Sequence, residues 1–158
     1  DKENVYLHIF NNKVLFKYKN IIFLSRLISG TYPVSSNIIP NNFRIDIECN
    51  YGDLYDMIDR ASLLTSDKDK NTIKLVLHNR ELIISSNSPE IGKVEEKINI
   101  DNDSEMSISF SSKYMLEAIK SFNSEKIHIL MNDDNSPIIV KSDKEVSLIQ
   151  LVLPIKTY

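Results

Sequence analysis

Few residues of this chain have the side-chain types that metal or acid–base chemistry requires. The three histidines, His8, His78 and His128, fall in separate stretches where apolar and polar residues alternate. None has a second histidine, a cysteine or an acidic residue at the spacing of a metal site. Each is therefore predicted to be an ordinary strand residue rather than a metal ligand.

Three aspartates, Asp53, Asp56 and Asp59, recur at every third position of a predicted helix. This spacing puts three carboxylates on one helical face, where they could hold a divalent cation, but any solvated acidic face shows the same spacing. We expect these aspartates to form a solvated acidic face rather than a metal site. The chain also lacks a glycine-rich phosphate loop, a Gly-x-Ser-x-Gly motif and a nucleophile beside a recognisable base. The residues thus predict no enzyme, no metal and no cofactor, and nothing in them supports a hydrolase.

Composition bounds the remaining possibilities. The 158 residues are 42% hydrophobic and 26% charged, which is typical of one globular domain or of one domain plus part of another. The net charge of −3 excludes a generally basic nucleic-acid binder, so any DNA contact needs local patches or an assembly. The single cysteine, Cys49, precludes an internal disulfide and favours a reducing, cytoplasmic compartment. The chain starts without methionine, which predicts a fragment or a processed chain.

Turn residues divide the chain in two. Residues 4–28 alternate apolar and polar side chains on both sides of an Asn-Asn pair, which predicts a hairpin of two or three strands. Gly30, Pro33 and Pro40 then interrupt the pattern, so residues 29–43 are predicted to be a linker or a domain boundary.

The rest of the chain contains an internal repeat. Strands are predicted at 44–50, 72–78, 80–87, 92–100, 106–111, 126–131, 137–142 and 146–152, with helices at 51–64 and 112–122. A shift of 61 positions superimposes five apolar residues on five others: Ile45, Ile47, Cys49, Leu54 and Ile58 fall on Met106, Ile108, Phe110, Met115 and Ile119. We therefore predict an α+β domain made of two β-α-β-β-β units.

Several long stretches together resemble the C-terminal portion of the bacterial β sliding clamps, the processivity factors of the replicative DNA polymerase. They are "FLSRLISGTYPVSSNIIP", "IDRASLL", "ISSNSPEIGKVEE", "SFSSKYMLEAIKSF" and "LIQLVLPIKTY". The resemblance implies a DNA-clamp fold, with two antiparallel four-stranded sheets and two helices in each domain. It also implies that residues 1–43 end the middle clamp domain and that residues 44–158 form the complete third domain.

The function that this resemblance implies is non-catalytic. The family forms a head-to-tail homodimeric ring that slides on duplex DNA without reading its sequence. Short linear motifs of the polymerase catalytic subunit, the clamp loader and repair polymerases insert into an apolar pocket. By position, the resemblance assigns to this pocket Pro33, Asn37, Ile38, Pro137, Leu151, Leu153, Pro154, Ile155 and Lys156. Asn37 and Lys156 depart from the family, which commonly has arginine at both positions.

Other surfaces follow from the same resemblance. The dimer contact is expected at Leu63 and Leu64 and along an acidic strand that contains Glu95 and Glu96. The two helices are expected to face DNA, with Arg60, Lys113 and Lys120 as the basic candidates. The alternative from a different class is a stand-alone peptide-binding scaffold module without a DNA role, which the acidic net charge suits.

The apolar C-terminal stretch yields the most specific prediction. Val146–Val152 has an ordinary reason to be apolar, because it is predicted to be a strand with one buried face. Leu153, Pro154 and Ile155 lie past the point where proline ends strand pairing. They are predicted to form an apolar lip of the peptide pocket.

Overall fold

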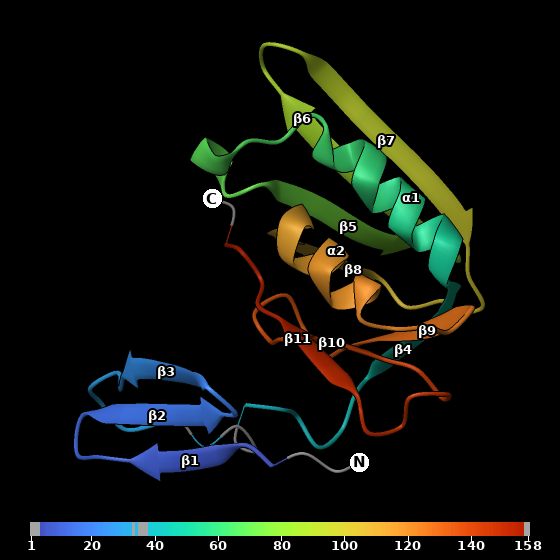
Figure 1. Cartoon of the computed structure of the whole chain (residues 1–158). Coiled ribbons are helices and arrows are strands. Elements are labelled where there is room, and N and C mark those ends of the chain that lie inside the picture. Colours follow the sequence, from blue (N-terminus) through green and yellow to red (C-terminus); the bar gives the residue numbers. More distant parts are fainter. Residues whose placement is uncertain (1–3, 33, 35–37, 157–158) are drawn as a thin grey trace. The chain divides into compact units, whose positions relative to one another are not determined.

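The computed structural model describes residues 4–32, 34 and 38–156. The chain divides into two units, residues 1–35 and 36–158, which are considered separately. Figure 1 shows the strands and helices of both units.

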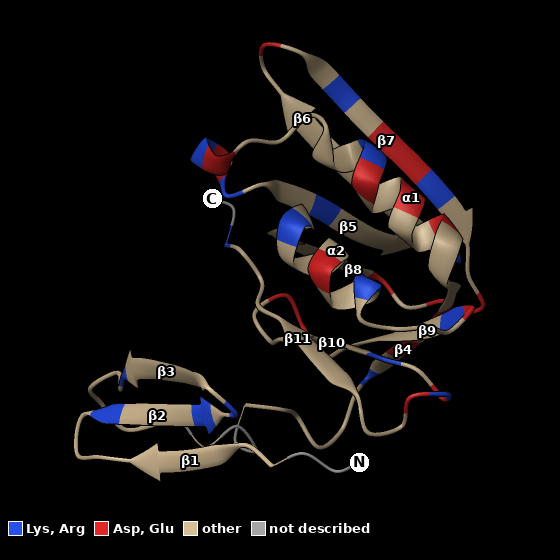
Figure 2. Cartoon of the chain, in the orientation of Figure 1, with Lys and Arg blue, Asp and Glu red and all other residues tan. Residues whose placement is uncertain are grey.

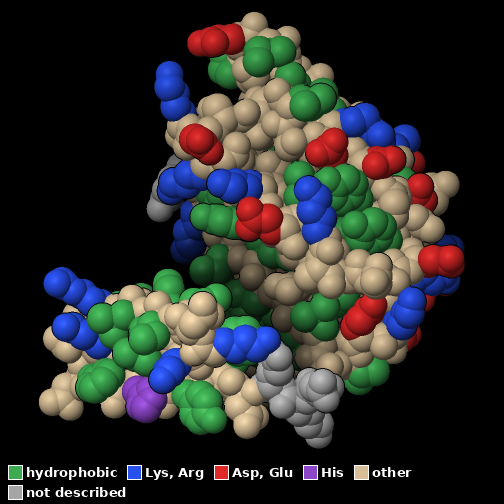
Figure 3. Space-filling model, viewed as in Figure 1, with side chains coloured by type: hydrophobic (Ala, Val, Ile, Leu, Met, Phe, Trp, Pro, Cys, Tyr) green, Lys and Arg blue, Asp and Glu red, His purple; other side chains and the backbone are tan. Residues whose placement is uncertain are grey.

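The first unit is a three-stranded antiparallel meander. Its strands are β1 (Tyr6–Ile9), β2 (Lys13–Tyr18) and β3 (Ile21–Arg26), paired in the order β1-β2-β3. The structure therefore resolves the predicted hairpin into three strands. Much of the apolar surface of this sheet is exposed within the unit, including Ile9 at 72% and Ile22 at 62% (Figure 3).

The second unit contains two antiparallel four-stranded sheets and two α-helices, which confirms the predicted fold class. One sheet consists of β4 (Ile45–Asn50), β9 (Lys126–Met131), β10 (Ile138–Lys141) and β11 (Ile149–Val152), in the order β11-β10-β9-β4. The other consists of β5 (Thr72–His78), β6 (Glu81–Ser88), β7 (Gly92–Asn99) and β8 (Met106–Ser111), in the order β7-β6-β5-β8. Helices α1 (Tyr51–Ser62) and α2 (Ser112–Lys120) lie side by side (Figure 1).

The two sequence repeats exchange their first strands. β4 belongs to the first repeat, yet it pairs with β9 of the second; β8 belongs to the second repeat, yet it pairs with β5 of the first. Each four-stranded sheet thus combines three consecutive strands of one repeat with one strand of the other. This exchange joins both repeats in one folding unit.

Alternation and helical spacing explain the core of this unit. Along β4, Ile45, Ile47 and Cys49 are buried while the residues between them are exposed. The buried face of α1 consists of Leu54, Met57, Ile58 and Ala61. The Asn50 side chain caps α1 by accepting hydrogen bonds from the N–H groups of Gly52 at 2.9 Å and Asp53 at 3.3 Å. The apolar faces of both helices and both sheets therefore form one core.

The last strand is shorter than predicted. It begins at Ile149, so the prediction of a strand from Val146 is wrong for residues 146–148. The preceding chain turns instead, because the Glu145 carboxylate accepts hydrogen bonds from the hydroxyls of Ser124 and Ser142. The Leu148 N–H donates to the Glu145 carbonyl at 2.9 Å, which closes the turn. The helices are also shorter than predicted and end at Ser62 and Lys120.

Candidate functional site

The chain crosses from one sheet to the other immediately after β11. Val152 still pairs with Ile138 of β10. Pro154 then forms a β-bridge with Phe110 of β8, and the Ile155 N–H donates to the Ser109 carbonyl at 2.7 Å. Proline has no N–H to donate, so regular pairing does not continue through residue 154. The segment predicted to be an apolar lip therefore connects the edges of both sheets.

A cavity of about 580 Å³ lies against this segment. That volume is within the usual range for ligand pockets. Five consecutive residues from β11 onward form an apolar floor, while a turn after α1 and the start of α2 form a polar wall. The floor consists of Leu151, Val152, Leu153, Pro154 and Ile155, and the wall consists of Asp67, Lys70, Asn71, Ser111, Lys113 and Tyr114.

The polar wall is built on a short 3-10 helix, Asp67–Asp69. The Asp69 carboxylate accepts from the N–H groups of Ser66 at 2.9 Å and Asn71 at 3.1 Å. Lys70 and Asn71 both have positive φ, at 60° and 54°. The Asn71 carbonyl then accepts from both the N–H and the hydroxyl of Ser112, at 2.8 Å and 3.1 Å. These bonds fix the turn to the first turn of α2.

The residues of the floor differ in exposure. Leu153 is 62% exposed, whereas Val152 is only 3% exposed. Leu151, Pro154 and Ile155 are half-buried. A large aliphatic side chain left open in a concave site is available for a ligand.

The structure brings together only some of the residues predicted for the pocket. Four of them line the cavity: Leu151, Leu153, Pro154 and Ile155. Ile38, Pro137 and Lys156 do not line it, although Pro137 precedes Ile138, the partner of Val152. Pro33 and Asn37 lie outside the described residues. The sequence analysis missed the wall at residues 67–71 and 111–114, whose turn and polar residues carry no distinctive motif.

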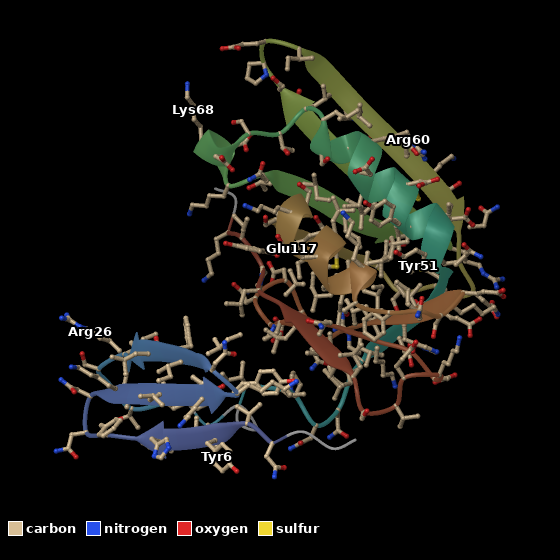
Figure 4. The ribbon with its side chains drawn as sticks, in the orientation of Figure 1. Tyr6, Arg26, Tyr51, Arg60, Lys68 and Glu117 are labelled. Atoms are coloured by element: carbon tan, nitrogen blue, oxygen red, sulfur yellow. The ribbon has the colours of Figure 1, made fainter. Side chains whose placement is uncertain are left out.

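Arg60, predicted to face DNA, is engaged within the domain. Its Nε and Nη2 atoms donate to the two carboxylate oxygens of Glu96 on β7, each at 2.5 Å. This pairing lowers the pKa of Glu96 and raises the pKa of Arg60. Asp56 lies 4.0 Å from the same guanidinium. Figure 4 shows Arg60 on the side of α1 next to β7.

The other basic candidates are Lys113 and Lys120, on the exposed side of α2. Lys113 lines the cavity, and Lys120 places its ammonium 5.4 Å from the centre of the Tyr55 ring. The hydrogen bond to Tyr55 is the main cause that raises the pKa of Lys120. Both helices carry acidic and basic residues (Figure 2): α1 has three aspartates and Arg60, and α2 has Lys113, Glu117 and Lys120. The helix face is therefore of mixed charge rather than uniformly basic.

The predicted dimer residues lie around the end of α1 and along β7. Leu63 is 74% exposed, and Leu64 is half-buried. Glu95 and Glu96 are consecutive residues of β7, so their side chains point to opposite faces of the sheet. Glu95 pairs with Lys93 at 2.5 Å, while Glu96 pairs with Arg60. β7 is an edge strand in the described sheet.

The histidines are placed as strand residues. His8 is an exposed residue of β1, and His78 ends β5 with its Nδ1 atom 2.7 Å from Glu105. His128 on β9 lies 2.8 Å from Asp46. Within the described ranges, no group of three or more His, Cys, Asp or Glu residues has a geometry that could hold a metal ion. No helix among the described residues is long and apolar enough to cross a membrane.

Comparison with known proteins decides the family. Residues 36–156 match the family model described as "DNA polymerase III beta subunit, C-terminal domain". The chain belongs to this family. A relative named "Beta sliding clamp" from Staphylococcus epidermidis RP62A is 42% identical over 159 residues, which cover 99% of this chain and 42% of the relative. One from Staphylococcus aureus Mu50 is 38% identical over 161 residues, again with 42% of the relative covered.

A solved member of the family has the same fold. The crystal structure of the DNA polymerase sliding clamp from Bacillus subtilis superimposes with a TM-score of 0.81 and 39% sequence identity. The match covers 98% of this chain and 41% of that one. The chain thus spans about two fifths of the length of these beta-subunit relatives. The resemblance noted in the sequence is confirmed.

Proposed function

We propose that this chain acts as part of a DNA sliding clamp, with residues 44–158 as the third clamp domain and residues 1–43 as the end of the middle domain. The observation that carries the proposal is the match of residues 36–156 to the C-terminal domain of the beta subunit. The two sheets and paired helices agree with the resemblance. The names of the relatives do not favour the alternative of a stand-alone scaffold module.

The proposed role is a non-catalytic tether in the cytoplasm. A closed head-to-tail ring, completed by further clamp domains, would hold duplex DNA without reading its sequence. Leu63, Leu64, Glu95 and the edge of β7 are the proposed dimer surface. Lys113 and Lys120 are the proposed DNA contacts. Arg60 is left out because its guanidinium is already paired with the Glu96 carboxylate.

The proposed partner site is the cavity against the C-terminal segment. Short linear motifs of the polymerase catalytic subunit, the clamp loader and repair polymerases would insert an apolar anchor there. The exposed Leu153 side chain and the half-buried Pro154 and Ile155 support this role. Among the described residues, those that line the cavity all belong to the second unit. We therefore expect the chain to retain measurable peptide binding.

A peptide titration tests the proposal. A fluorescent peptide with a Gln-x-x-Leu-Phe anchor pattern is titrated with the chain and with a variant that combines Leu153→Asp with Pro154→Ala. We expect the double variant to lose binding, because a charge in the apolar floor must be desolvated by the anchor. Ile91→Asp is the matched control, since Ile91 is 69% exposed and lies outside the cavity. Absence of binding to the unaltered chain would overturn the proposed pocket.

A further inference from the structure

The side chain of Asn132 holds the linker where it enters β4. Asn132 follows β9, whose pairing with β4 ends at Met131 and Ile45. Its Oδ1 atom accepts a hydrogen bond from the Arg44 N–H at 2.8 Å, and its Nδ2 atom donates to the Asn42 carbonyl at 2.9 Å. The attachment of this part of the chain to β9 thus continues past the end of the strand pairing.

The two bonds determine the orientation of the Asn132 amide. The amide oxygen meets an N–H group and the amide nitrogen meets a carbonyl, so a flipped side chain would lose both bonds. Residues 38–44, coloured cyan in Figure 1, belong to no helix or strand. Among the described residues, no other side chain forms a hydrogen bond with them. Asn132 is therefore the side chain that ties this stretch to the second unit by hydrogen bonds.

The backbone that carries Asn132 is fixed independently of the linker. The carboxylate of Asp133, the next residue, accepts hydrogen bonds from the N–H groups of Asn135 at 2.9 Å and Ser136 at 2.7 Å, and from the Ser136 hydroxyl at 2.9 Å. The bond from Asn135 is the largest cause that lowers the pKa of Asp133, and the charge of Arg44 contributes. The turn between β9 and β10 thus holds the anchor in place for the linker.

We propose that Asn132 is a positioning residue for the joint between the two units, because it fixes the direction in which the linker leaves the second unit. The geometry of this anchor stands by itself, while its function rests on the proposed assignment of the two units to consecutive clamp domains. A linker that is fixed as far as Asn42 has fewer conformations to lose when a ring of linked domains closes. Asn132 thus favours the closed ring, although it does not line the peptide cavity.

Amide hydrogen exchange tests the anchor. We expect Asn132→Ala to speed exchange at the Arg44 amide by at least about fivefold, because one hydrogen bond contributes roughly that factor. Asn132→Asp keeps an oxygen that accepts the same bond, so it should retain most of this protection while losing the bond to Asn42. Asn135→Ala is the matched control, since Asn135 lies in the same turn and its side chain donates to Asp134 rather than to the linker.

A distance measurement tests the joint. Spin labels are attached at Asn11→Cys in the first unit and at Glu90→Cys in the second, which are exposed positions between strands. Cys49 is buried, so labelling of the folded chain is confined to the introduced cysteines. We expect Asn132→Ala to broaden the distribution of distances measured by double electron–electron resonance, while Asn135→Ala keeps the distribution of the parent chain.

The outcomes separate this inference from the proposed function. Unchanged exchange at Arg44 in Asn132→Ala overturns the anchor, and faster exchange with an unchanged distance distribution overturns its role in the joint. If circular dichroism shows that Asn132→Ala does not fold, Asn132→Asp carries the distance test, since it also lacks the bond to Asn42 and should broaden the distribution. Peptide binding by the parent chain is independent of both measurements, so a failure of the joint leaves the proposed peptide pocket intact.

Discussion

Truncating Leu153 should separate partner binding from folding. The side chain is 62% exposed, so roughly three fifths of its surface remains for a ligand to bury. Complete burial of a leucine side chain is worth about 1.5–3 kcal/mol, so a ligand that covers the exposed part gains about 1–2 kcal/mol from it. Leu153→Ala is therefore expected to weaken peptide binding by about 5- to 30-fold. Stability should change by less than about 0.5 kcal/mol, as for other exposed substitutions.

The assay compares two variants by anisotropy titration and thermal denaturation. Ile91→Ala removes a similarly exposed aliphatic side chain, at 69%, from a site outside the cavity. We expect both variants to melt close to the parent chain, and only Leu153→Ala to lose affinity. A Leu153→Ala variant that melts much lower would show that this residue serves the fold. Equal affinities of the two variants would refute the burial argument.

Three further predictions concern the domain itself. Cys49 is buried and desolvation raises its thiol pKa to about 12, so thiol reagents at pH 8 should modify it only after denaturation, as mass spectrometry would show. Asn50→Ala should lower the unfolding free energy by about 1 kcal/mol in a urea titration, because it removes the cap of α1. Arg60 lowers the pKa of Glu96, so the pair stabilises the fold above the ordinary glutamate pKa of 4.5 and loses this effect as pH falls through the lowered value. Arg60→Ala should thus melt below the parent at pH 7, with the difference shrinking in acid; a constant difference would count against the pair.

The sequence predicted the elements of this domain better than their connections. Alternation in β4 and helical spacing in α1 reflect burial of one face, which each segment shows by itself. The exchange of β4 and β8 between the sheets has no such local signal. A strand with one apolar face fits either sheet, so the choice depends on contacts between the two repeats. The strand error at 146–148 has the same origin, since Glu145 is held by Ser124, a residue distant in sequence.

The candidate site likewise combines residues that the sequence predicted with residues that it did not. Leu153 and Pro154 were assigned to the pocket by the resemblance; the residues add only that an apolar segment interrupted by proline does not fit an ordinary strand. Lys70 and Asn71 were missed because neither is glycine, the residue that most often signals a positive φ. Their conformation depends on hydrogen bonds made by Ser66 and Asp69, which short polar sequences do not reveal. Arg60 was assigned to the DNA-facing helices by the resemblance, and its ion pair with Glu96 gave no sequence signal because the two residues lie 36 positions apart.

The way the C-terminal segment is anchored bears on how tightly a partner can bind. The Pro154 bridge connects the floor of the cavity to Phe110, which is fully buried, and the Ile155 N–H adds a bond to Ser109. Val152 is held on the other side by β10. A floor fixed at both ends loses little conformational freedom when a ligand arrives, so more of the burial energy of the anchor appears as affinity. Because the partner peptides would be short and extended, the ordering cost would then fall on the peptide rather than on the clamp domain.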